Sequence, residues 1–177
     1  MIETERLLLR GWRDDDFDHW FAMCSDMRVM ATIGPLRTDD EARETIHTQQ
    51  TIQADMGYCF WAIERKSDGR MIGFCGLEDG PDATPIASRI EIGWRLAFDC
   101  WRQGYAREAA LAALGWGFDN QAFDRIWAIT SRGNDRSWGL MERLGMMRHF
   151  DLDFDHPNVP FGSPLKPHIT YSIARPN

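Results

Sequence analysis

The chain lacks long apolar runs, paired cysteine motifs and an excess of basic residues, and each absence excludes a class of protein. Its longest apolar runs fall far short of the roughly 20 residues that a transmembrane helix needs. The N-terminus lacks the charged and then apolar pattern of a secretory signal. The four cysteines are widely separated, with no Cys-x-x-Cys pair and no matching histidine spacing, so neither a zinc site nor a disulfide framework is expected. A cytoplasmic protein without a metal is the expectation.

The net charge also limits the partners. The formal charge of −7 disfavours nucleic acid or an anionic membrane, because affinity for phosphate backbones depends on clustered Lys and Arg. Cationic substrates suit this balance better.

The chain has the length and apolar content of one domain. Its 177 residues can bury a core, and its eight tryptophans supply much apolar area. Trp20 and Trp138 are the two that could border a pocket. No repeat, low-complexity tract or linker divides the chain, which predicts a single domain over residues 1–177.

Apolar periodicity and turn signals predict the element order β-α-α-β-β-β-α-β-α-β-β, a mixed α/β domain. The acidic run 14–16 is interpreted mainly as a helix cap, and a second helix is expected from Thr38 to about Asp55. Asp68-Gly69 lies between two apolar runs and predicts a hairpin. Residues 78–87 are expected to form a loop.

The most informative stretch runs from Trp101 to Ala110 and follows an alternating strand over 88–96. A short loop leads there into an alanine-rich helix, whose first backbone N–H groups are free to hold an anion. Gly104 has no Cβ, so an anion can approach the main chain closely. The stretch therefore predicts a phosphate-binding turn, and no Gly-Lys-Ser/Thr follows that would make it a Walker loop.

Residues 101–106 read Trp-Arg-Gln-Gly-Tyr-Ala and resemble the acyl-CoA pyrophosphate loop of the GNAT N-acetyltransferases, Gln/Arg-x-x-Gly-x-Gly/Ala. Trp101 stands where the branch that acetylates ribosomal-protein N-termini is similar in having Trp. That branch usually continues with Gly-Lys, and this chain has Arg102-Gln103 there. Further along, the strand 126–130 is followed by Asn134 and Ser137, which are similar to the family's Asn-x-x-Ser…Leu-Gly-Phe signature, with Met146 in place of Phe. The closing strands are similar too, so the likeness covers nearly the whole chain.

The resemblance implies the GNAT fold: a single mixed, mostly antiparallel sheet with helices on both faces, splayed where the pantetheine arm of acetyl-CoA inserts like an extra strand. Acetyl-CoA would be the co-substrate, without a metal. The residues implied to bind it are Trp94, Arg95 and Leu96 through backbone groups, and Arg102, Gln103, Gly104, Tyr105, Ala106, Arg107, Asn134 and Ser137.

Acetyl transfer to an amine requires a neutral amine, a polarised carbonyl and a proton for the leaving thiolate. Strand alternation points Glu91 away from the side of its two isoleucine neighbours. The resemblance implies that Glu91 acts as the base, directly or through water, and the alternative is a structural salt bridge. Ser137 is the candidate acid, because many family members use a Tyr in this helix and none lies here, which leaves Ser137 or a water. Helix capping by Asn134 is a second, compatible interpretation.

Other titratable groups are weaker candidates. Asp151, Asp153 and Asp155 share one strand face, which is usually a solvated face, but they would attract a cationic amine if that face lined the cleft. His156 and His168 titrate in a range suited to a base, and they rank below Glu91.

The leading hypothesis is an acetyl-CoA-dependent N-acetyltransferase that acts on a small-molecule amine or a peptide N-terminus by direct transfer in a ternary complex. No Cys lies in the matched motifs, so a covalent cysteine intermediate is not expected. The alternative is a non-catalytic acyl-CoA-binding or sensing module on the same fold. A nucleotide-binding oxidoreductase is disfavoured by the absence of Gly-x-Gly-x-x-Gly. A homodimer is common among similar proteins.

Overall fold

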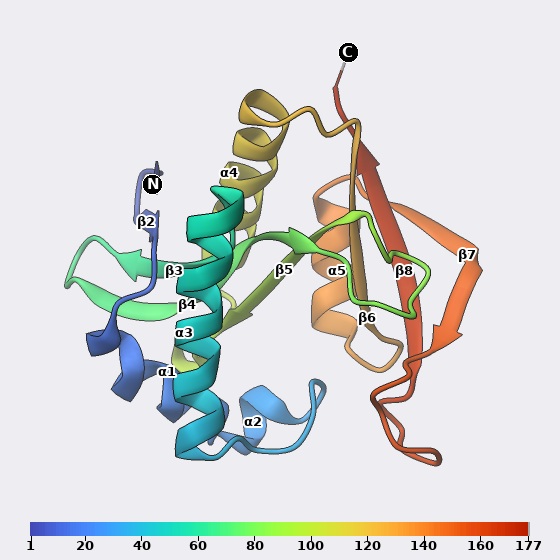
Figure 1. The fold of residues 1–177 in the computed structure, drawn as a ribbon, viewed down its shortest axis with the longest axis horizontal. Coiled ribbons are helices and arrows are strands. Elements are labelled where there is room, and N and C mark those ends of the chain that lie inside the picture. The colour runs from blue at the N-terminus through green and yellow to red at the C-terminus, as the bar shows by residue number, and fades with distance from the viewer. Residues whose placement is uncertain (177) are drawn as a thin grey trace.

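One eight-stranded sheet runs through the molecule, with helices on both of its faces (Figure 1). The computed structural model describes residues 1–176. The strand order is β1-β2-β3-β4-β5-β6-β8-β7, and within the described residues every neighbouring pair is antiparallel except β5 and β6. The strands are β1 (Ile2–Glu3), β2 (Leu7–Arg10), β3 (Phe60–Arg65), β4 (Arg70–Asp79), β5 (Ile90–Leu96), β6 (Arg125–Ser131), β7 (Met147–Asp155) and β8 (Pro167–Ala174). This architecture confirms the predicted fold.

The helices cover the two faces of the sheet. They are α1 (Phe17–Cys24), α2 (Met27–Met30), α3 (Asp39–Met56), α4 (Tyr105–Asn120) and α5 (Asp135–Arg143). Phe74 of β4 contacts Trp20 of α1, with ring centroids 5.8 Å apart. Leu77 of the same strand lies under α4, where a Cβ added to Gly117 would stand 2.6 Å from its Cδ1. Since strand neighbours at odd spacing point to opposite faces, α1 and α4 cover opposite sides of β4.

The predicted elements are largely present, with three differences. The hairpin of β3 and β4 turns at Asp68-Gly69, where Gly69 has φ +69°. However, β4 continues to Asp79, so Glu78 lies on a strand rather than in the expected loop. The short elements β1 and α2 were not predicted, because two and four residues are too few to show a period.

The acidic run 14–16 is more than a cap. It forms a 3₁₀ turn, and Asp16 points inward, with 2% of its surface exposed. Two parallel hydrogen bonds of 2.8 and 2.7 Å join its carboxylate to the guanidinium of Arg10 on β2. Arg10 also donates from Nε to Glu64 of β3 at 2.7 Å. This buried network fixes the start of α1 to the sheet, and the cap interpretation is corrected to that extent.

The second helix is confirmed. α3 begins with a capping box in which the Glu41 amide donates to the Thr38 hydroxyl at 3.3 Å and the Glu41 carboxylate accepts from the Thr38 amide at 2.8 Å. It ends at Gly57, whose φ of +79° is typical of a helix C-terminus. No helix in the range 1–176 is long and apolar enough to cross a membrane.

The junction between β5 and β6 places the candidate site. The two strands are parallel and pair in register only at Glu91 and Trp127, and beyond that point they diverge (Figure 1). The C-terminal half of β5 therefore has an edge without a neighbouring strand on the β6 side. The divergence separates the sheet into β1–β5 and β6–β8–β7.

Candidate active site

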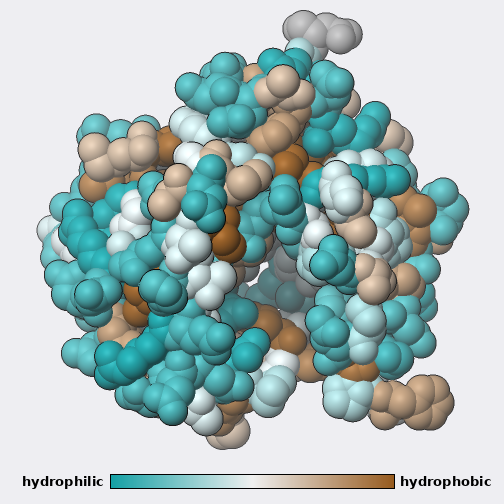
Figure 2. Space-filling model, viewed as in Figure 1, coloured by the Kyte–Doolittle hydropathy of each residue, from teal (hydrophilic) through white to brown (hydrophobic). Residues whose placement is uncertain are grey.

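A cleft of about 800 Å³ opens where β5 and β6 diverge. Figure 2 shows the surface hollowed near its centre on this side of the molecule. The start of α4, the start of α5 and the segment after α2 complete the walls, and Ser131 on β6 donates to the Thr32 carbonyl of that segment at 3.0 Å. The cleft brings together most of the predicted site residues: Glu91, Trp94, Arg95, Leu96, Arg102, Gly104, Tyr105, Ala106, Arg107, Asn134 and Ser137.

The predicted anion-binding turn has the expected backbone. Gly104 precedes α4 with φ +84°, a conformation that glycine adopts without steric cost. The first amide to bond inside the helix is that of Glu108, which donates to the Gly104 carbonyl at 3.0 Å. The backbone N–H groups of residues 105–107 are therefore not used by the helix and can bind an anion.

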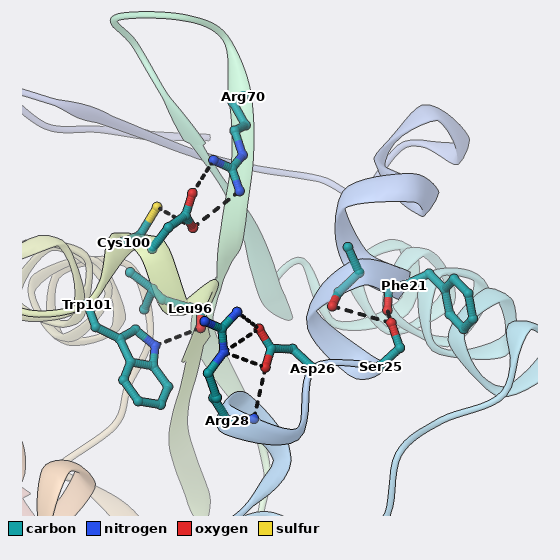
Figure 3. A network of polar contacts seen from close by, with 10 residues as sticks. Phe21, Ser25, Asp26, Arg28, Arg70, Leu96, Cys100 and Trp101 are labelled. Atoms are coloured by element: carbon teal, nitrogen blue, oxygen red, sulfur yellow. Dashed lines mark hydrogen bonds and ion pairs between the residues drawn. The ribbon is translucent and has the colours of Figure 1, made fainter.

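Side chains hold this turn in place. The indole of Trp101 donates to the Leu96 carbonyl at 2.9 Å, which ties the turn to the end of β5 (Figure 3). Gln103 donates to the Asp99 carbonyl at 2.6 Å and lies outside the cleft lining, unlike the other loop residues. Arg6 donates to the Gln103 carbonyl at 3.0 Å. Gln103 thus contacts the loop itself.

Besides Arg95 of β5, four more arginines line the cleft although the chain is acidic as a whole. Arg102 and Arg107 belong to the turn, while Arg136 and Arg143 come from α5. The guanidinium of Arg136 lies 4.7 Å from the centroid of the Trp101 ring. The two α5 arginines were not predicted to belong to the site, although their spacing of seven residues places them on one helix face and was a usable signal. Such a cluster suits a ligand with several phosphate groups.

Glu91 lies at the single position where β5 and β6 pair, at the inner end of the cleft. Its cross-strand partner on β4 is Glu78, so two carboxylates face each other on one side of the sheet. Burial and the Glu78 charge raise the pKa of Glu91 to about 8, while the backbone amide of Ile129 acts in the opposite direction. Because the charge acting on Glu91 is a carboxylate, the salt-bridge interpretation has no support here.

Glu78 is held by a glutamine of α3. Gln49 donates from Nε2 to Glu78 and accepts at Oε1 from the Phe60 amide at 2.9 Å. Burial raises the pKa of Glu78 as well, against the lowering effect of Gln49. Glu78 was not predicted as a site residue, because its strand runs past the point where the loop was expected.

The raised pKa of Glu91 has a consequence for stability. An unfolded Glu ionises near pH 4.5, whereas Glu91 in the folded chain ionises near 8. Between these values the folded state binds the extra proton, so the free energy of unfolding falls as pH rises from about 4.5 to 8. We expect Glu91→Gln to melt at the same temperature as the parent near pH 4.5 and several degrees higher at pH 8.5, measured by circular dichroism.

Glu44→Gln on the exposed side of α3 serves as the control and should show no such trend. A melting difference for Glu91→Gln that is equal at both pH values would contradict the expected proton uptake.

Asn134 and Ser137 lie at the start of α5, as predicted, but the capping mechanism differs. Asn134 occupies the N-cap position without a side-chain cap bond. Its amide nitrogen donates instead to the Thr130 hydroxyl of β6 at 3.1 Å, while its main-chain carbonyl accepts from the amides of Ser137 and Trp138. Asn134 is thus the N-cap residue, as expected, but its side chain joins α5 to β6 and does not cap a backbone N–H. Ser137 lines the cleft.

The weaker candidates separate into two groups. Asp151, Asp153 and Asp155 are not part of the cleft lining, and Asp153 is paired with Arg132 and Arg148, in agreement with a solvated face.

His156 and His168 do line the cleft, with ring centroids 4.7 Å apart. Burial lowers the pKa of both histidines. Of the two tryptophans expected near a pocket, Trp20 borders a smaller cavity beside the cleft, whereas Trp138 lines neither space.

Comparison with known proteins gives a consistent result. The family model described as the acetyltransferase (GNAT) domain matches residues 6–147. The uncharacterised protein YkkB of Bacillus subtilis is 32% identical over 160 residues, which are 90% of this chain and 91% of that protein. A crystal structure of a GNAT-family acetyltransferase from Bacillus anthracis superposes with a TM-score of 0.79, 26% identity and 98% coverage of both chains.

A more distant structure shares the fold. It is the spermidine N-acetyltransferase of Vibrio cholerae in complex with CoA and spermine, with a TM-score of 0.75, 17% identity and 97% coverage of both chains.

Proposed function

Because this chain belongs to the GNAT acetyltransferase family, and is therefore an acyltransferase, we propose that it moves an acetyl group directly from acetyl-CoA to a primary amine in a ternary complex. One observation carries the proposal: the anion-binding turn, the unpaired edge of β5 and the carboxylate of Glu91 all face a single cleft. Direct transfer needs both substrates positioned side by side more than it needs many reactive side chains.

Successive parts of the cleft fit successive parts of the acetyl-CoA molecule. The free amides of residues 105–107, with Arg102 and the arginines of α5, would hold the pyrophosphate. Backbone groups of residues 94–96 would hold the pantetheine arm along the open edge of β5. This arrangement would direct the thioester toward Glu91, and Ser137 lines the same cleft from the start of α5.

The chemical step then assigns one role to each group. The amine nitrogen attacks the thioester carbon, the carbon–sulfur bond breaks, and an amide and a thiol are the products. Glu91 accepts the proton that the amine loses, directly or through a water. Ser137 donates a hydrogen bond to the leaving sulfur, and the proton that the thiolate takes up comes from its hydroxyl or from water.

The acceptor is proposed to be a small-molecule amine or a peptide N-terminus. The turn's likeness to the branch that acetylates ribosomal-protein N-termini supports the second class. The spermine in the complex of the Vibrio cholerae enzyme supports the first.

A thiol-release assay tests the proposal. Purified protein is mixed with acetyl-CoA and separately with polyamines, amino acids, aminoglycosides and N-terminal peptides, and free CoA is measured against a reaction without amine. Amine-dependent release with formation of the N-acetyl product is expected for at least one class. Tight CoA binding with no amine-dependent release would favour the non-catalytic module and contradict the proposal.

Arg102 has a special role in the turn. Its φ of +60° is left-handed, a conformation that costs a non-glycine residue roughly 1–2 kcal/mol. The side chain lines the cleft beside the proposed pyrophosphate position. We expect Arg102→Gly to weaken CoA binding about tenfold, because a charge-assisted contact is lost, without lowering the melting temperature.

Arg102→Ala provides the matched control. It removes the same charge and keeps the left-handed strain, so it should bind CoA as weakly as the glycine variant and melt at a lower temperature. Titration calorimetry and thermal melts measure the two effects. Unchanged CoA affinity in both variants would place Arg102 outside the binding site.

A further inference from the structure

A second cavity of about 200 Å³ lies beside the cleft, between the sheet and helices α1 and α3. It shares Phe60, Phe74 and Arg95 with the cleft, so the two spaces meet at these side chains. The second cavity is on the side of the sheet that carries Glu91 and Glu78, because Glu91, Gly93 and Arg95 alternate on one face of β5. It therefore extends the part of the cleft on the Glu91 face of the sheet, where the acceptor amine would bind, which we call the acceptor side.

Arg95 enters this cavity as a charge that lacks a carboxylate. Its Nη1 contacts the thiol of Cys24 at 3.8 Å, and its Nε is buried without a hydrogen-bond partner anywhere in residues 1–176. Its guanidinium carbon lies 5.1 Å from the Trp20 ring centroid and 5.6 Å from that of Phe74. Burial lowers the pKa of Arg95, yet a guanidinium remains charged at neutral pH. A partly buried cation whose Nε is buried without an acceptor is costly to the fold.

A second unpartnered donor lines the same cavity. Trp20 is 2% exposed, and within the described chain its indole Nε1 has no acceptor. Arg37, which pairs with Glu41 at 3.6 Å, borders the cavity too and adds a second positive charge next to Arg95. Two buried donors without acceptors, beside two cations, form a surface that an anion would satisfy.

The opposite end of the acceptor side carries negative groups, and one of them, Glu78, also lines the second cavity at the end away from Arg95. Glu91 and Glu78 pair across β5 and β4, and Arg95 and Phe74 pair four residues further along. Four residues of strand span about 13 Å. Between the two ends, the rings of Phe60 and Phe74 are stacked with centroids 5.2 Å apart. The acceptor side is thus negative at the catalytic end, aromatic in the middle and positive at the far end.

We propose that the second cavity binds an anionic group of the acceptor, so that the amine acetylated by this protein also carries a carboxylate or a comparable anion. The inference rests on the proposed function. Arg95 and the Trp20 indole donate to the anion, and the amine extends past the stacked rings toward Glu91. A purely cationic polyamine lacks the group that these donors require.

Matched pairs of acceptors test the inference. Straight-chain ω-amino acids of increasing length and α-amino acids are each compared with their primary amides in the thiol-release assay. The acid of at least one pair is expected to have a kcat/KM about tenfold or more above its amide. Arg95→Gln should reduce that acid-to-amide ratio to near one, and Trp20→Phe, which keeps an aromatic ring and removes the N–H donor, should reduce it by a smaller factor.

Arg43→Gln on the exposed side of α3 removes the same charge away from the cavity and should leave the ratio unchanged. If Arg95→Gln does not fold, Arg95→Lys, which keeps the charge and loses the planar donor geometry, should still lower the ratio. Acids that are no better than their amides overturn the inference, as does a ratio that survives both Arg95 variants.

A binding measurement separates this inference from the proposed function. Thermal shifts are recorded with CoA and each member of the pairs. Larger shifts with acids than with amides, lost in Arg95→Gln, support the anion site even if no amine is acetylated. Equal shifts for acid and amide, together with equal or absent turnover, overturn it.

Discussion

Replacement of Glu91 by glutamine is expected to lower kcat/KM by about 100- to 1,000-fold at pH 8.5, in the lower part of the roughly 10²- to 10⁴-fold range for a lost general base. The amide has the shape of the carboxylate but cannot accept the amine's proton. In the parent protein the pKa of Glu91 is raised to about 8, so the carboxyl is mostly protonated below this pH and ionised above it. The logarithm of kcat/KM should therefore rise with pH and level off above 8, and this rise should be absent from Glu91→Gln.

The amine titrates as well, so the experiment needs two acceptors of different basicity. If the rising limb of the pH profile reports the ionisation of Glu91, it levels off near pH 8 for both acceptors. If it reports the amine, it moves with the amine's own pKa. Glu78→Gln provides a second check. It removes the negative charge that helps to raise the pKa of Glu91, so the limb should move to lower pH. Retention of the limb in Glu91→Gln would assign the base elsewhere, with His156 and His168 as the next groups in the cleft.

Replacement of Asp16 by alanine is expected to lower the free energy of unfolding by about 3 kcal/mol, near the lower end of the range for breaking a buried ion pair. Arg10 and Asp16 are 5% and 2% exposed, and two hydrogen bonds join them. Without Asp16 the Arg10 guanidinium stays buried with Glu64 as its remaining carboxylate, which limits the loss. Urea denaturation followed by tryptophan fluorescence measures the change.

Asp39→Ala is the matched control. Asp39 pairs with Arg43 at 2.7 Å on the surface of α3, with about half of each side chain exposed, and solvent screens such a pair. Its removal should change the unfolding midpoint far less than that of Asp16. Equal effects of the two substitutions would show that burial of the Arg10 network contributes little.

Local patterns predicted those parts of the fold that depend on neighbouring residues. The Asp68-Gly69 hairpin, the capping box of α3 and the turn before α4 each consist of a few consecutive residues whose backbone preferences agree with the final structure. The order of strands was not readable in this way. The family resemblance implied only a mixed, mostly antiparallel sheet that is splayed at the cofactor site, and nothing local in β6 indicates that it pairs with β8 and with β5 at one position.

The parts of the site that were missed are contacts between distant elements. Glu78 acquires its importance from Glu91, thirteen residues later, because register places them opposite each other. Arg95 was assigned to cofactor binding through its backbone, and its side chain gained a separate significance only when α1 brought Trp20 and Cys24 against it. Asn134 is a residue type that favours the N-cap position, and it occupies that position, but its side chain donates to Thr130 of β6, a contact that the local pattern does not show.

The single paired position between β5 and β6 has a consequence for how the molecule opens and closes. Few ladder hydrogen bonds cross this seam, and α4 packs mainly on β4 and β5 whereas α5 packs on β6. Local opening at the seam therefore requires breaking few backbone hydrogen bonds. A bound molecule with amide groups along its length would supply the absent ladder. Hydrogen exchange at the amides of residues 93–96 should therefore slow sharply when CoA is added. In that complex the ligand takes the place of a strand beside β5.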